Sequence, residues 1–355
     1  MIAVTDPRSN NFNLLRLVAA SSVIFSHAVD IVTGKPDGIE SLIGHSGGWI
    51  AVSAFFSMSG FLIYRSIQRS ANIMEYICAR CLRILPGLWA MLLLTTLFLG
   101  VFLSSLPLST YIVHTQTGGY ILGNALLYWP NYLLPGVYET NPLQAVNGSI
   151  WTLRFEFTCY LLTLLLFLIG AYRSERAFLV LVGTTLIGYL GMIAAAASMG
   201  RLDSLLHDGS DIGKLHRLWF AFFIGIVIGR YVEILWFRFW MVALAVIVSI
   251  ALFRTPLFET VLILSIGLAV FWFAFQQATW LAPFRRMHDY SYGIYIYAFP
   301  VQQAVVHLAP NLSPMGNAIV SLVVTVPIAA LSWHWIEKPI LAMKSFFIRK
   351  PRVEG

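Results

Sequence analysis

The stretch FNLLRLVAASSVIFSH, residues 12–27, is the first long apolar run of the chain and predicts a transmembrane helix. Two side chains that membrane spans rarely tolerate, Arg16 and His27, lie within it. At 100° per residue they fall on nearly the same helix face, roughly 16 Å apart along the axis. A charged and a titratable group on one face inside lipid indicate a functional site. The alternative is that Arg16 extends to the headgroups and His27 is a packing residue.

The composition identifies the class of protein. Of 355 residues, 58% are hydrophobic and only 11% are charged, and the mean hydropathy is +0.77, as in a polytopic protein embedded in a lipid bilayer. The net charge of +7 does not indicate a nucleic-acid partner, because the basic residues fall between the apolar runs, where the positive-inside rule places them. Cys78 and Cys81 form half a zinc site at most, so we expect no metal site.

Ten apolar runs have about the length that a membrane-crossing helix needs. They cover residues 12–29, 48–64, 86–106, 149–170, 177–198, 216–234, 236–253, 257–276, 290–309 and 316–336. The stretch 118–136 is also apolar, but asparagines and prolines interrupt it. A crossing there would place the basic C-terminal tail outside, against the positive-inside rule. We therefore expect an all-α, polytopic helical bundle of about ten transmembrane helices, with both termini cytoplasmic and a re-entrant or interfacial segment near 118–136.

Two short motifs follow the first span. The second span contains FFSMSGFLI, in which Ser59 and Gly60 form a small pair that serves helix packing or contacts a substrate. The turn RCLRILP follows, and we expect Pro86 in the first turn of the third span. Arg80 and Arg83 share a face if this turn is helical, and two guanidiniums suit a polyphosphate. Ordinary positive-inside anchoring is the alternative interpretation of these arginines.

The segment WTLRFEFTCY, residues 151–160, carries a second ionisable group into the membrane. If this helix enters from outside, Glu156 lies roughly 10 Å deep, at about the depth of His27. Tyr160 follows Glu156 by four residues and shares its face. The alternative is a structural ion pair of Glu156 with Arg16, since Arg154 points away from Glu156 on the helix.

The C-terminal region supplies two more motifs. One is SYGIYIYAFP, which contains Tyr292, Tyr295 and Ala298. The other is WIEKP, in which Glu337 either pairs with the Arg80 and Arg83 turn or is an interfacial charge.

These motifs, in this order, resemble the acyltransferase-3 family, bacterial membrane enzymes that O-acetylate O-antigens, exopolysaccharides, peptidoglycan and Nod factors. The resemblance runs from Phe12 to Pro339. Asn13 replaces the usual aspartate of the first helix, and Ala298 replaces the usual histidine of the S-Y-x-x-Y-L-x-H-x-P motif. Many relatives carry a C-terminal esterase-like domain. Here we expect a single membrane acyltransferase domain over 1–340 and a short basic cytoplasmic tail over 341–355, without that domain.

The resemblance implies transfer of an acetyl or other acyl group from cytoplasmic acetyl-CoA, as co-substrate, to a hydroxyl of a lipid-linked or cell-surface carbohydrate. It implies no permanently bound cofactor and a multi-pass location in the bacterial inner membrane. The expected catalytic residues are His27 as general base, Arg16 and Glu156. The expected donor-binding residues are Arg80, Arg83 and Ser59, the acceptor-binding residues are Trp151, Tyr160, Tyr292 and Tyr295, and the supporting residues are Gly60, Pro86 and Glu337. Direct transfer and an acyl-histidine intermediate both fit these residues.

A second hypothesis is a proton-coupled transporter of a lipid-linked sugar or an organic anion, because buried arginine, histidine and glutamate also occur in such carriers.

Overall fold

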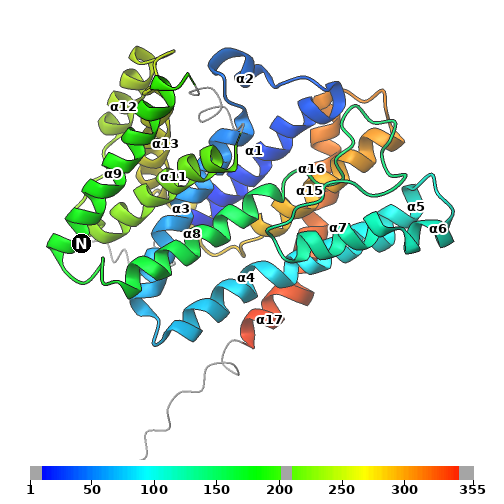
Figure 1. Ribbon diagram of the computed structural model, residues 1–355, viewed down its shortest axis with the longest axis horizontal. Helices are drawn as coiled ribbons and strands as arrows, with labels where there is room; N and C mark the ends of the chain where they lie inside the picture. The colour runs from blue at the N-terminus through cyan, green and yellow to red at the C-terminus, as the bar shows by residue number, and fades with distance from the viewer. Residues whose placement is uncertain (1–9, 201–209, 344–355) are drawn as a thin grey trace, which may run out of the picture.

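The computed structural model describes residues 10–200 and 210–343, and this part of the chain is all-helical (Figure 1). Every expected apolar run forms a helix. The main helices are α1 (Phe12–Thr33), α3 (Gly47–Arg69), α4 (Ile73–Leu94), α8 (Trp151–Leu168), α9 (Glu175–Ser198), α11 (Asp211–Tyr231), α12 (Phe239–Ala251), α13 (Phe258–Ala274), α15 (Ser291–Leu308) and α16 (Pro314–Ser332). The shorter helices are α2 (Gly38–Ile43), α5 (Val101–Leu103), α6 (Leu108–Val113), α7 (Thr115–Ala125), α14 (Ala282–Arg285) and α17 (Lys338–Ala342).

Two helices continue through π-helical turns, α4 through Thr95–Gly100 into α5 and α16 through Trp333–Glu337 into α17. Within the described ranges, seven helices are long and apolar enough to cross a bilayer. The number becomes eight if α13 and the segment Thr279–Arg285, which meet at 94°, form one broken span. The polytopic membrane bundle is therefore confirmed. Ten crossings and cytoplasmic termini stay predictions, and the basic tail lies outside the described residues from 344 onward.

The stretch expected not to cross the membrane contains only a short helix. α7 has 11 residues, so it is roughly 16 Å long and cannot span a hydrocarbon layer of about 30 Å. After it, residues 126–150 form no regular helix. The Asn124 side chain donates hydrogen bonds to the carbonyls of Tyr120 and Asn131, and so ties this loop back to α7. α7 lies alongside α4 (Figure 1).

The centre of the bundle is the close pair of α3 and α11, which depends on glycine. A Cβ atom on Gly60 would lie 1.8 Å from the carbonyl oxygen of Phe222, and one on Gly225 would lie 2.0 Å from that of Ser57. No side chain fits at either position without separating the helices. Gly60 therefore packs against α11, as one of the two sequence-based interpretations predicted.

The prediction that Pro86 lies in the first turn of the third span was wrong. α4 begins thirteen residues earlier, where Asn72 accepts a hydrogen bond from the backbone N–H of Glu75, and Pro86 lies inside the helix. Membrane helices tolerate an internal proline because neighbours satisfy the backbone groups that it frees. Close by, the Tyr292 hydroxyl donates to the carbonyl of Ile84 at 2.6 Å. The longer helix makes Arg80 and Arg83 true i,i+3 neighbours.

Candidate active site

A cavity of about 460 Å³ lies where α1, α3, α4, α8 and α15 meet. We call it the arginine cavity. Its polar lining is Arg16, Ser59, Arg80, Arg83, Thr152, Glu156, Tyr160, Asp289, Ser291, Tyr292 and Tyr295. Its apolar lining includes Val52, Phe55, Phe56, Leu62, Ile63 and Trp333. It thus offers three guanidiniums beside an apolar wall.

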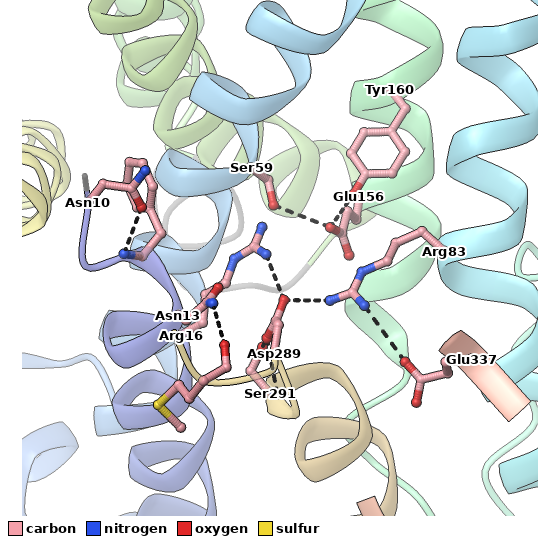
Figure 2. Close-up of polar contacts among 12 residues, drawn as sticks. Asn10, Asn13, Arg16, Ser59, Arg83, Glu156, Tyr160, Asp289, Ser291 and Glu337 are labelled. Atoms are coloured by element: carbon pink, nitrogen blue, oxygen red, sulfur yellow. Dashed lines mark hydrogen bonds and ion pairs between the residues drawn. The ribbon is translucent and has the colours of Figure 1, made fainter. Parts of the chain in front are cut away.

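Asp289, in the loop before α15, connects two of these guanidiniums. Nη1 of Arg16 lies 2.9 Å from Oδ2 of Asp289, and Nη2 of Arg83 lies 2.6 Å from the same oxygen (Figure 2). Ser291 donates its backbone N–H and its hydroxyl to the other oxygen, Oδ1. Burial opposes ionisation, but the guanidiniums of Arg83 and Arg16 and the Ser291 hydrogen bonds outweigh it, and the pKa of Asp289 falls to about 2. The carboxylate therefore holds α1 and α4 together.

Arg83 is fixed on several sides. Its Nη1 lies 3.7 Å from Oε2 of Glu337, at the end of the α16 extension (Figure 2). Its guanidinium carbon lies 5.6 Å from the ring centre of Tyr292 and 5.7 Å from that of Trp333. Of the two interpretations of Glu337, pairing with the arginine turn is the one that the structure bears out.

Arg80 has weaker partners than Arg83. Its guanidinium carbon lies 5.9 Å from the ring centres of both Tyr76 and Tyr160, and Nη2 is 3.4 Å from the Ser66 hydroxyl. Nε is buried and makes no hydrogen bond to any residue that the structure describes. Among the described residues, Arg80 is therefore the one guanidinium of the arginine cavity that pairs with no carboxylate.

Glu156 lines the arginine cavity from α8. Its Oε1 accepts hydrogen bonds from the Tyr160 hydroxyl, one turn along the same helix, and from the Ser59 hydroxyl of α3 at 3.3 Å (Figure 2). The predicted shared face of Glu156 and Tyr160 is confirmed. Arg16 pairs with Asp289 rather than with Glu156, and Arg154 pairs with Asp211 at 2.5 Å. The alternative of a structural Arg16–Glu156 ion pair is therefore wrong.

A second cavity of about 540 Å³ contains His27, and we call it the histidine cavity. Its lining includes Val23, His27, Asp30, Glu40, His45, Trp49, Val52, Tyr132, Trp151, Lys214, Arg217, Tyr295 and Phe299. Nδ1 of His27 lies 3.9 Å from Oδ2 of Asp30, one helical turn further along α1. The ring of His27 meets that of Phe299 edge-on, with 5.3 Å between the centres. Oδ1 of Asp30 is buried and makes no hydrogen bond within the described part of the chain.

His27 and Glu156 do not form the pair that their matching depth predicted. Each lines a different cavity, and Val52 and Tyr295 line both. Counting residues gives the depth of a side chain along its helix but not the neighbour that it faces. Glu156 faces Ser59 on α3, and the carboxylate that pairs with His27 is Asp30.

The four expected acceptor-binding residues are divided between the cavities. Trp151 lines the histidine cavity, Tyr160 and Tyr292 line the arginine cavity, and Tyr295 lines both. Consecutive residues at the start of α8, Trp151 and Thr152, thus belong to opposite cavities. Only Trp151 and Tyr295 are in place to contact a molecule beside His27.

Three positions outside the expected site explain the departures from the motifs. The Asn13 side chain donates to the carbonyl of Met287 at 2.8 Å and so connects α1 to the loop before α15. Ala298 is buried in an apolar cluster with Ala20 and Ile24, where no polar group is needed. His307 lines neither of the two cavities, so it does not stand in for the missing histidine.

The sequence motifs missed Asp289 and Asp30. Asp289 stands two residues before Ser291, where the S-Y-x-x-Y motif begins, and a buried loop carboxylate facing arginines gives no periodic signal. Asp30 follows His27 by three residues, and this spacing predicts that the two side chains are neighbours on one face of the helix.

The sequence matches a known protein family along most of its length. The profile of an acyltransferase domain, acyltransferase 3, matches residues 9–334. The chain belongs to the acyltransferase-3 family. It is therefore a membrane acyltransferase.

Three relatives are similar in sequence to this acyltransferase. An O-acetyl transferase of Shigella phage Sf6 is 29% identical over 353 residues, covering 95% of this chain and 98% of the relative. Nodulation protein 10 of Rhizobium leguminosarum bv. viciae is 28% identical over 392 residues, covering 96% and 95%. The putative peptidoglycan O-acetyltransferase YrhL of Bacillus subtilis (strain 168) is 23% identical, and the match spans about half of its length (51%). No solved structure matches the acyltransferase chain significantly.

Proposed function

We propose that this acyltransferase moves an acetyl group from acetyl-CoA to a hydroxyl of a lipid-linked or cell-surface carbohydrate. The donor binds in the arginine cavity, and the acceptor binds in the histidine cavity. The observation that carries the proposal is the division of the site into these two cavities, one with guanidiniums and one with a histidine, which meet at Val52 and Tyr295.

The arginine cavity suits a nucleotide-bearing thioester. Guanidiniums bind phosphate groups bidentately, and Arg80 is the one of the three in the cavity that pairs with no described carboxylate. The apolar wall, which includes Phe55 and Leu62, suits an uncharged pantetheine arm and its short acyl group. Ser59 and Tyr160, both held by Glu156, supply hydroxyls beside that arm.

The histidine cavity suits a carbohydrate. Trp49 and Trp151 supply aromatic faces, and Asp30 and Glu40 supply carboxylate acceptors for sugar hydroxyls. His27 acts as general base. With Nδ1 towards Asp30, Nε2 accepts the proton of the acceptor hydroxyl as the oxygen attacks the thioester carbonyl. The C–S bond breaks, the thiolate of CoA leaves, and the proton from His27 neutralises it.

The orientation follows from charge. Arg65 and Arg69 end α3, and Arg285 and Arg286 end the segment before Asp289, close to the start of α1. Basic residues gather on the cytoplasmic side of bacterial membrane proteins. The proposal therefore places the arginine cavity towards the cytoplasm, where acetyl-CoA is made, and the protein in the bacterial cytoplasmic membrane.

The test is transfer by the purified protein in lipid nanodiscs. Isotope-labelled acetyl-CoA is supplied with lipid-linked glycans from the host, and the glycans are analysed by mass spectrometry. We expect an alkali-labile labelled acetyl group on a sugar hydroxyl. Labelled acetyl groups on protein or lipid alone, or no consumption of acetyl-CoA in the presence of glycan, would contradict the proposal.

A further inference from the structure

The arginine and histidine cavities adjoin at a partition made by three helices, α3, α8 and α15. Val52 of α3 and Tyr295 of α15 line both cavities. Trp151 and Thr152 at the start of α8 line one cavity each. An acyl group that leaves a donor in one cavity for an acceptor in the other has to react at this partition.

Tyr295 is the fixed side of the partition. Its hydroxyl donates to the carbonyl of Ser149 at 2.9 Å and lies 2.8 Å from the hydroxyl of Thr152. Since a tyrosine hydroxyl has a single proton, Thr152 is the donor in the second hydrogen bond. The Tyr295 ring also meets that of Phe55 edge-on, with 5.9 Å between the centres. These contacts come from two helices and a loop, so the ring cannot turn aside without breaking buried hydrogen bonds.

Val52 is the side of the partition without polar anchors. It is buried, with 7% of its surface exposed, and its branched side chain has no group that hydrogen-bonds to a neighbour. The size of its side chain therefore affects how much room is left where the two cavities adjoin.

We propose that Val52, which lines both cavities together with the fixed Tyr295 ring, determines the length of the acyl group that the enzyme transfers. This inference rests on the proposed function, because it places the thioester carbonyl between the two cavities. The methyl of an acetyl group lies against Val52, and a longer chain would overlap with its side chain. In an apolar pocket, one methylene changes discrimination by roughly 10- to 200-fold.

The first test measures acyl preference. Purified wild type, Val52→Ala and Val52→Phe are compared with acetyl-, propionyl- and butyryl-CoA, with kcat/KM for transfer and the donor Kd determined separately. Val52→Ala should raise the propionyl-to-acetyl ratio of kcat/KM by roughly tenfold or more. Val52→Phe should lower kcat for all donors while CoA itself binds with little change, since the guanidiniums are untouched.

Val18 provides the matched control. It is a valine on α1 that is 53% exposed and lines neither of the two cavities. Val18→Ala and Val18→Phe should keep the wild-type chain-length preference. If Val52→Ala keeps that preference as well, while wild type transfers acetyl from acetyl-CoA, the inference is overturned and the proposed function stands.

The second test needs no substrate. In a variant with Cys78, Cys81 and Cys159 replaced, single cysteines are placed at Val52, Ser59 or Val23, and a small membrane-impermeant thiol reagent is added to one side of closed vesicles. Ser59 lines only the arginine cavity of the two and Val23 only the histidine cavity, so each should react from one side. The Val52→Cys variant should react from both sides.

The two tests separate the possible failures. Reaction of Val52→Cys from a single side, with the two reference cysteines reacting as expected, would show that Val52 is not at a junction and would overturn the inference. Reaction from both sides without any acyl transfer by wild type would overturn the proposed function and leave the junction at Val52 established. If replacing the native cysteines prevents folding, the acyl-preference test, which keeps them, decides the inference.

Discussion

Arg83 and Asp289 lie 206 residues apart in the chain, yet 2.6 Å separates Nη2 from Oδ2, and Arg16 reaches the same oxygen at 2.9 Å. Removing one member of a buried ion pair typically costs about 3–5 kcal/mol. We expect Asp289→Asn to lower the midpoint of thermal unfolding clearly. Acetyl-CoA should restore more stability in this variant than in wild type, because its phosphates replace the missing anion. Asp211→Asn, which removes an exposed partner of Arg154, is the control and should cost little.

The pH dependence of this ion pair has a defined sign. The pKa of Asp289 is lowered to about 2 in the folded protein, against about 3.9 for an unfolded aspartate. Its stabilising contribution is therefore complete above the unfolded value and is lost as pH falls through the folded value. The stability difference between wild type and Asp289→Asn should stay constant from about pH 5 to 8 and shrink only below about pH 4. A difference that already shrinks between pH 7 and 5 would show that another group carries it.

Arg80 and Arg83 should behave differently when replaced. Arg80→Ala should raise the KM for acetyl-CoA by roughly 10-fold or more, as loss of a hydrogen bond to a charged group predicts, with little change in unfolding temperature. Arg83→Ala should also destabilise the protein, because Glu337 loses its arginine partner and Asp289 keeps only one of its two, Arg16. Donor affinity of Arg80→Ala should depend less on salt than that of wild type. Arg69→Ala, at the exposed end of α3, is the control. An equal rise in the KM for acetyl-CoA in that variant would show that Arg80 only anchors the membrane topology and does not bind the donor.

The fold was largely predictable because the signal of a membrane helix is local. Each of the ten apolar runs became a helix, since hydropathy over about 20 residues decides insertion. The start of α4 was missed because the Asn72 cap and the charged turns before Pro86 lie outside that apolar window. The π-helical extension that carries Glu337 was not predictable from hydropathy either.

The site was less predictable because it depends on which helices face each other. The arginine pair of α4 followed from its i,i+3 spacing, and the Glu156–Tyr160 contact followed from i,i+4. Asp289 could not be found in this way, since its partners lie on α1 and α4, far away in sequence. Depth along a helix placed His27 and Glu156 together, but the direction in which each side chain points separates them.

His27→Ala should abolish transfer, with normal expression and an unchanged Kd for acetyl-CoA, because His27 does not line the arginine cavity. Asp30→Asn should lower kcat by roughly 10²-fold, within the range for losing general-base assistance. Both variants are assayed for transfer and, separately, for donor binding. His307→Ala is the control, since that histidine lines neither of the two cavities. Wild-type turnover by His27→Ala would exclude it as the base.

Glu156 lines the arginine cavity and not the histidine cavity. Its hydrogen bonds to Ser59 and Tyr160 place it with the donor, whereas the carboxylate beside His27 is Asp30. Glu156→Gln keeps the shape and removes the charge, so it should weaken donor binding, which Asp30→Asn leaves unchanged. Residues of one unit are strongly non-additive, and separate sites add in free energy. Glu156→Gln combined with Tyr160→Phe should therefore be little worse than the more damaging single variant, whereas the losses of Glu156→Gln and Asp30→Asn should multiply. If kcat/KM instead shows strong coupling of Glu156 to Asp30 and none to Tyr160, the carboxylate of Glu156 acts across the partition on His27, and the two cavities work as one catalytic site.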